Sequence, residues 1–274
     1  MVVGKPRTEG VWSAQEVKRP MDPFVFLLTL ILAFLAEYVD ASLGMGFGTT
    51  LGPLLLILGF APSEIIPSLI VAQFISNICA VIFHHRFGNV DLRFGSAQLK
   101  VALILSGTGV FGSLVAVLLS RFIGNEGIKS YMALSVVMFG FYLLFKTLFN
   151  RKTVMIFSWG KIIGLGLFAA FNKGLTGGGY GPIITSGQIL TGISGKSAVG
   201  VTAFSEAVTC VAAVLAYLHS GSLPESWLLF GVSLGSVISV PFSALTVRKL
   251  PDVLIRTAIG LFSIIIGLLL FAKF

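Results

Sequence analysis

The stretch Asp40-Ala41-Ser42-Leu43-Gly44-Met45-Gly46-Phe47-Gly48 decides how this chain folds, because a similar stretch recurs in the second half. The second copy reads Lys173-Gly174-Leu175-Thr176-Gly177-Gly178-Gly179-Tyr180-Gly181. A shift of 133 positions superimposes the two copies without a gap. Five of the six glycines between Asp40 and Asp91 then meet a glycine, where chance would give about one. The chain therefore contains an internal repeat, whose glycine-interrupted segments are typical of a transport site.

The composition is that of a membrane protein. Hydrophobic residues make up 55% of the chain and charged residues 11%, against roughly 25% in a soluble domain. Several apolar stretches reach the ~20 residues that a membrane-spanning helix needs. The net charge of +8 comes from basic residues in short loops, so membrane orientation explains it without nucleic acid. Cys79 and Cys210 lie inside apolar segments and are expected to be free thiols.

We expect four parts along the chain: a polar N-terminal tail at 1–22, a first membrane repeat at 23–149, a basic linker at 150–161 and a second membrane repeat at 162–274. The apolar run from Pro23 to Tyr38 begins too late for a signal peptide, so it is interpreted as a retained membrane segment.

Each repeat contains five apolar pieces. In the first repeat they are Pro23–Tyr38, Thr49–Phe60, Ile65–Phe83, Leu99–Leu119 and Ile128–Phe149. In the second they are Ile162–Phe171, Pro182–Leu190, Ser197–Leu218, Trp227–Leu245 and Val253–Phe271. The second piece of each set follows a glycine cluster and is too short to span a bilayer. We therefore predict an all-α polytopic membrane protein, in which each repeat has a glycine-broken re-entrant helix pair plus three spanning helices.

The basic loops predict that the two repeats insert in opposite orientations. One basic cluster follows the third piece of the first repeat, one lies in the linker, and one follows the fourth piece of the second repeat. Cytoplasmic loops hold the excess of Lys and Arg, and the shift by one helix is what inversion requires. The three clusters would then face the cytoplasm, with both termini outside.

The glycine breaks are candidate anion-binding sites. Irregular backbone survives in a membrane only where protein buries it or a wet cavity adjoins it. The half-helices, expected to begin near Thr49 and Ile183, would offer unpaired amides and a positive dipole end to an anion. The expected substrate-binding residues are Gly44, Gly46, Gly48, Thr49, Thr50, Gln73, Thr176, Gly177, Gly178, Gly179, Gly181 and Glu206. The alternative is that the glycines serve only close helix packing.

Gln73 and Glu206 are partners at the same offset, and each lies near the middle of a long helix. A carboxyl at that depth is costly and marks a functional site by default, so Glu206 is the candidate for proton coupling. The alternative is a paired Glu206 that holds helices together. Lys173, which aligns with Asp40, would attract an anion or pair with Asp40 or Glu206.

Other chemistries lack the residues they need. His84 and His85 are expected at the membrane interface, with too few neighbouring ligands for a metal. No catalytic residues fall within reach of one another, and no G-x-x-x-x-G-K-[ST] loop for a nucleotide is present. We therefore expect no enzyme activity, no metal and no cofactor.

Several motifs carry a resemblance to a known family. They are Val39-Asp40-Ala41 with the first glycine cluster, Gly59 to Pro67, Phe83 to Asp91, Gly177 to Pro182, and Lys196 to Thr202. With them the chain resembles the TauE/SafE sulfite exporter family, also called the 4-toluenesulfonate uptake permease family, from about Phe34 to Leu270. The resemblance implies transport of sulfite or small organosulfonates, usually outward, across the cytoplasmic membrane. Met45 and Phe47 stand where many relatives have a plainer glycine run, which bears on specificity.

The resulting hypothesis is a multi-pass secondary transporter of the inner (cytoplasmic) membrane that exports sulfite or a small organosulfonate by alternating access, with Glu206 as the candidate for coupling to protons. Its partners would be the small anion and the lipid bilayer, with no nucleic acid, and a homodimer is one compatible assembly. The alternatives are a passive anion channel, a transporter of another small sulfur-containing or carboxylate anion, and an intramembrane enzyme or assembly factor.

Overall fold

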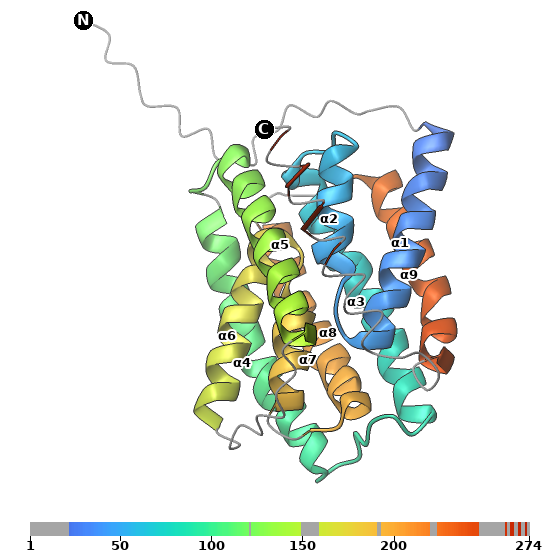
Figure 1. Cartoon of the computed structure of the whole chain (residues 1–274), viewed down its shortest axis with the longest axis vertical. Coiled ribbons are helices and arrows are strands. Elements are labelled where there is room, and N and C mark those ends of the chain that lie inside the picture. Colours follow the sequence, from blue (N-terminus) through green and yellow to red (C-terminus); the bar gives the residue numbers. More distant parts are fainter. Residues whose placement is uncertain are drawn as a thin grey trace, which may run out of the picture.

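The protein is a helical bundle (Figure 1). The structure, a computed structural model, describes residues 22–120, 122–148, 159–190, 193–219 and 224–246, with isolated positions 261, 264–265, 268–269 and 272. The helices of the first half are α1 (Pro23–Leu43), α2 (Phe47–Ile57), α3 (Pro62–Arg86), α4 (Ala97–Ser120) and α5 (Asn125–Leu148). Those of the second half are α6 (Trp159–Thr176), α7 (Tyr180–Leu190), α8 (Gly195–His219) and α9 (Ser226–Thr246). The described ranges contain no strand.

The helices agree with the expected apolar pieces, with one instructive difference. Helix α1 continues five residues beyond the expected end at Tyr38 and so includes Asp40. The polar residues there stay helical because the backbone bonds continue, the last being that from the amide of Gly44 to the carbonyl of Asp40 (2.6 Å). The half-helices α2 and α7 likewise begin two to three residues earlier than expected, at Phe47 and Tyr180. The predicted piece Val253–Phe271 falls largely outside the described residues.

Five of the described helices are long and apolar enough to cross a membrane. They are α1, α3, α4, α8 and α9. Large apolar side chains remain exposed along them, including Phe24, Leu215 and Phe242. Exposed apolar side chains along several long helices are suited to contact with lipid in a bilayer. The prediction of an all-α polytopic membrane protein is therefore confirmed.

The internal repeat reappears in the helix bounds. Helices α2 and α3 begin and end 133 positions before α7 and α8. Each break carries two glycines with positive φ, namely Gly44 (68°) and Gly46 (132°) in the first half and Gly177 (74°) and Gly179 (82°) in the second. Such φ values are strained for other residues, so these four glycines turn the chain at each break.

The two halves interlock through symmetric helix pairs. Helix α1 packs along α9, and its counterpart α6 packs along α4, while α3 and α8 pack on each other. Small residues make these approaches close, since a Cβ on Gly235 of α9 would lie 3.1 Å from Ala33, and one on Gly174 of α6 would lie 2.6 Å from Ala116. Close packing of this kind is how helices associate in membranes.

The chain enters the two halves from opposite ends of the bundle. In Figure 1, α1 begins at the top and α6 begins at the bottom. The loop between α3 and α4 lies at the same bottom end as the start of α6, whereas the α4–α5 connection lies at the top. The α3–α4 loop and the start of α6, each of which contains part of a basic cluster, are therefore at one end.

The proposed segments are only partly covered. The tail at 1–22 and the linker at 150–161 fall almost entirely outside the described residues, and the division into repeats at 23–149 and 162–274 stays a prediction.

Candidate anion site at the paired helix breaks

The two glycine breaks lie against each other, backbone to backbone. A Cβ on Gly178 would lie 2.5 Å from the carbonyl carbon of Gly48, and a Cβ on Gly181 would lie 3.0 Å from that of Gly44. Neither neighbour is a flexible side chain, so only glycine fits at these positions. Packing therefore accounts for Gly48, Gly178 and Gly181, and the breaks that the sequence places 133 residues apart meet inside the bundle.

The hydroxyl groups expected to bind an anion are engaged by backbone carbonyls in this conformation. Thr49 and Thr50 donate to the carbonyl of Gly46 (3.1 and 2.6 Å), within their own half. Thr176 donates to the carbonyl of Asn172 (2.9 Å) and accepts from the amide of Gly178 (3.1 Å). These three side chains hold the breaks in shape, and any contact with a ligand would require them to exchange partners.

The hydroxyl of Thr185 joins the two halves at the breaks. Thr185 of α7 donates to the carbonyl of Gly44 at the end of α1 (2.8 Å), and its oxygen lies 2.9 Å from that of Thr202. This bond satisfies a carbonyl that the end of a helix would otherwise leave without a partner.

The starts of α2 and α7 differ in charge environment. The Asp40 carboxyl accepts a hydrogen bond from the amide of Phe47 (3.3 Å), so an internal acceptor already occupies the start of α2. The residue at the equivalent place before α7 is Lys173, a cation, which cannot accept from an amide. The pseudo-symmetric breaks are thus chemically unequal: the first carries its own carboxyl, and the second carries an ammonium group.

Lys173 lies at the centre of a buried polar cluster. Its side chain is 0% exposed and its Nζ lies 2.7 Å from Oε1 of Glu206, which is 3% exposed. The same ammonium donates to Oε1 of Gln73, whose Nε2 donates to Glu206 (3.3 Å). Gln73 and Glu206 are repeat partners, so α3, α6 and α8 meet at one network. Of the alternatives left open for Lys173, the structure contains its ion pair with Glu206.

A further buried carboxyl belongs to this cluster, and the interpretation of the sequence did not include it. Glu37 of α1 is 1% exposed, and its charge interacts with Asp40, Glu206 and Lys173. Its Oε2 has no hydrogen-bond partner among the described residues, and its carboxyl lies near the hydroxyl of Ser76. The signal that identified Glu206, a carboxylate in an apolar run, also applies to Glu37.

His84, expected at the membrane interface, is buried inside the protein. It is 0% exposed; its Nε2 donates to the carbonyl of Ala41 (3.1 Å), and its Nδ1 faces the Asn89 amide nitrogen (3.0 Å). The ring therefore ties the loop after α3 to the last turn of α1. Its neighbour His85 is exposed.

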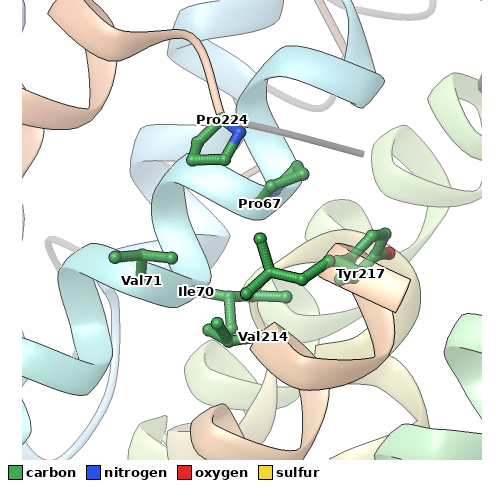
Figure 2. Close-up of a pocket in the computed structure, with 7 residues that line it drawn as sticks. Pro67, Ile70, Val71, Val214, Tyr217 and Pro224 are labelled. Carbon is green, nitrogen blue, oxygen red and sulfur yellow. The ribbon is translucent and has the colours of Figure 1, made fainter. Parts of the chain in front are cut away.

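The apolar pockets are poor places for an anion. Figure 2 shows one between α3 and α8, where Pro67, Ile70 and Val214 leave a volume of about 10 Å³. That space holds about one water molecule. A larger pocket of about 260 Å³, also between α3 and α8, is lined by Phe74, Phe204 and other apolar side chains, with no charged group. Lys173 lines neither of these two pockets, and its side chain is 0% exposed.

The described residues also contain no group of three or more His, Cys, Asp and Glu side chains arranged to hold a metal ion. Cys79 and Cys210 are free thiols.

Comparison with known proteins supports these observations. The family described as sulfite exporter TauE/SafE matches residues 29–270. The chain is 31% identical over 245 residues to the probable membrane transporter protein YtnM of Bacillus subtilis, covering 86% of this chain and 79% of that protein. It is 25% identical over 254 residues to the probable membrane transporter protein YdhB of the same organism, covering 90% of this chain and 98% of that protein. No solved structure matches.

These relatives are membrane transporters and not enzymes, in agreement with the helices and with the expected family. The interlocked apolar bundle, its two glycine breaks and the match over most of its length lead to one conclusion: this chain is a multi-pass membrane protein of the TauE/SafE family of transporters.

Proposed function

We propose that this protein is a secondary transporter that exports sulfite or a small organosulfonate across the cytoplasmic membrane. The observation that carries the proposal is the wholly buried ammonium of Lys173, one turn before the break that leads into α7. A buried cation beside a positive helix end is a strong attractor for a small anion. The name of the matching family supports sulfite as the substrate class.

In this proposal the anion binds on the α7 side of the paired breaks. The first turn of α7 offers backbone amides, and glycines at 177, 178, 179 and 181 allow close approach of the backbone. The start of α2 is less suited because the Asp40 carboxyl already accepts from Phe47. Gly44, Gly46 and Gly48 would then shape the opposite wall, with Thr49, Thr50 and Thr176 exchanging their present acceptors for the ligand.

The Lys173–Glu206 ion pair would be the switch of the cycle. An arriving anion competes with the Glu206 carboxylate for the same ammonium. Once displaced, Glu206 would be an uncompensated carboxylate in a low-dielectric interior, and taking up a proton from water would remove that charge. Anion binding at Lys173 and proton binding at Glu206 are thereby coupled. Gln73 would keep its hydrogen bonds to both side chains.

Alternating access would come from the two repeats. We propose that they insert in opposite orientations and that the end of the bundle with the α3–α4 loop and the start of α6 faces the cytoplasm. The start of α1 and the start of α6 at opposite ends of the bundle support this arrangement (Figure 1). Rocking of one repeat against the other around the paired breaks would open the buried cluster to each side in turn.

Sulfite binding to the purified protein tests the proposal. We expect Glu206→Gln to keep saturable binding, because the anion no longer competes with a carboxylate, and to abolish the pH dependence of transport. Adding Lys173→Met should weaken binding by about tenfold to a hundredfold, the loss of a charge-assisted hydrogen bond worth about 1.5–3 kcal/mol. Glu126→Gln and Lys129→Met are matched controls, because each removes one partner of an ion pair at the start of α5.

Sulfate, thiosulfate and sulfoacetate serve as competitors and rank the substrate class. Undiminished sulfite binding in the Lys173→Met, Glu206→Gln double variant would contradict the proposed site. A passive channel is the rival function: it would let the anion follow its electrochemical gradient, whereas a coupled transporter accumulates it against that gradient in proteoliposomes.

A further inference from the structure

The buried cluster around Lys173 contains more negative than positive groups. Glu37, Asp40 and Glu206 are 1%, 6% and 3% exposed, and each interacts electrostatically with the single ammonium of Lys173. Three ionised carboxylates would leave a net charge of −2 inside the bundle. An uncompensated buried charge costs several kcal/mol, so the cluster must hold further positive charge.

The geometry distinguishes the three carboxyls. Asp40 accepts from the amide of Phe47 at the start of α2, where the helix dipole favours an anion. Glu206 accepts from Lys173 at 2.7 Å and from Gln73. Both therefore have partners that suit their charged form.

Glu37 is less well compensated. Its Oε2 is buried without a hydrogen bond among the described residues, its carboxyl accepts from the neutral hydroxyl of Ser76, and it shares the ammonium of Lys173 with Asp40 and Glu206. Asp40, one turn further along α1, adds a like charge. A carboxyl in that position is far less costly as a neutral acid than as an anion.

Among the described residues, the nearby titratable groups are Asp40 on α1, Lys173 on α6, Glu206 and the thiol of Cys210 on α8, and the thiol of Cys79 and the buried His84 on α3. Of these groups, Lys173 is the cation that acts on Glu37. Helices α2 and α9 carry no ionisable side chain. The described residues also place no three metal-ligating side chains together, which disfavours a metal cation as the missing charge.

We propose that Glu37 carries a resident proton, which makes it a second proton site in the first repeat, distinct from the Lys173–Glu206 pair. Release of this proton would place two negative charges one turn apart on α1, directly before the glycine break. Proton release is therefore tied to a movement of α1 that admits water. The proton site itself does not depend on the substrate; only its coupling to export rests on the proposed function.

Infrared spectroscopy of the purified protein tests this assignment without transport. At neutral pH we expect the carbonyl band of a buried, protonated carboxylic acid, lost in Glu37→Gln and kept in Glu126→Gln, which alters an exposed carboxyl. Absence of the band from the unaltered protein would overturn the proposal. So would a band that persists in Glu37→Gln.

Thermal unfolding gives a second readout. Glutamine has nearly the shape of a protonated glutamic acid, so the melting temperature of Glu37→Gln should be close to that of the unaltered protein. If Glu37 had to be charged, the neutral amide of glutamine would be a poor replacement and the melting temperature would fall. A large fall in melting temperature for Glu37→Gln would contradict a resident proton. If the band follows Glu37 while sulfite is neither bound nor exported, the proton site stands and the proposed substrate fails.

Discussion

Replacing Gly178 by alanine measures how tightly the two helix breaks fit. The added Cβ would lie 2.5 Å from the carbonyl carbon of Gly48, 2.7 Å from the amide nitrogen of Thr49 and 2.9 Å from the Cα of Gly48. An ordinary contact begins near 3.4 Å, and all three atoms belong to backbone that cannot rotate away. Overpacking typically costs about 1–3 kcal/mol, and we expect the upper end here, about 3 kcal/mol.

The assay is thermal unfolding in detergent. About 3 kcal/mol corresponds to a fall in melting temperature of roughly 6–12 °C, at about 2–4 °C per kcal/mol for a chain somewhat shorter than this one. Gly164→Ala is the matched control, because it lies in α6, and its Cβ would enter open space. Alanine should stabilise that helix by about 0.5–1 kcal/mol. Equal melting temperatures for Gly178→Ala and the unaltered protein would refute the backbone-to-backbone contact.

Two further predictions concern the buried polar groups. Lys173→Met should destabilise the protein by about 3–5 kcal/mol because Glu206 is left unpaired, and adding Glu206→Gln should recover most of that loss in a double-mutant cycle of unfolding free energies. Strictly additive effects would contradict the ion pair. His84→Phe should cost about 1–3 kcal/mol by leaving a carbonyl at the end of α1 without its donor, whereas His85→Phe should change the melting temperature little. Similar losses in both histidine variants would argue against the specific bond.

The chemical difference between the two breaks would explain why the proposed transporter binds one anion rather than two. Duplication alone would produce two equivalent helix starts. Here Asp40 supplies an internal acceptor at the first, and Lys173 replaces it at the equivalent place in the second. A single exchange therefore separates a helix start whose amide already has a side-chain acceptor from the helix start that the proposal assigns to the ligand.

Much of the fold could be predicted from the sequence because its determinants are local. The lengths of the apolar runs distinguish spanning helices from the short α2 and α7, and glycines adopt the positive φ values that break the helices. The 133-residue offset predicted the matching bounds of both halves. The end of α1 was missed because Asp40 was interpreted as the end of a membrane segment, whereas its polar side chain is satisfied inside the bundle.

The candidate site could be predicted only in part. Glu206, Gln73 and the glycines were identified individually, and Glu37 could have been identified by the same rule for a carboxylate in an apolar run. The interfacial placement of His84 stays a prediction, whereas its bond to the carbonyl of Ala41 could not be foreseen from its position at a helix end.

By itself, the sequence determined an all-helical membrane protein with two related halves, each broken at a glycine cluster, because apolar length and backbone freedom act within a few residues. Only the tertiary structure decided which residues meet. Lys173 bonds residues 100 and 33 positions away, and the breaks press together across 130 positions. Such contacts depend on how α3, α6 and α8 pack, and hydrophobic periodicity carries no information about which buried polar group faces which.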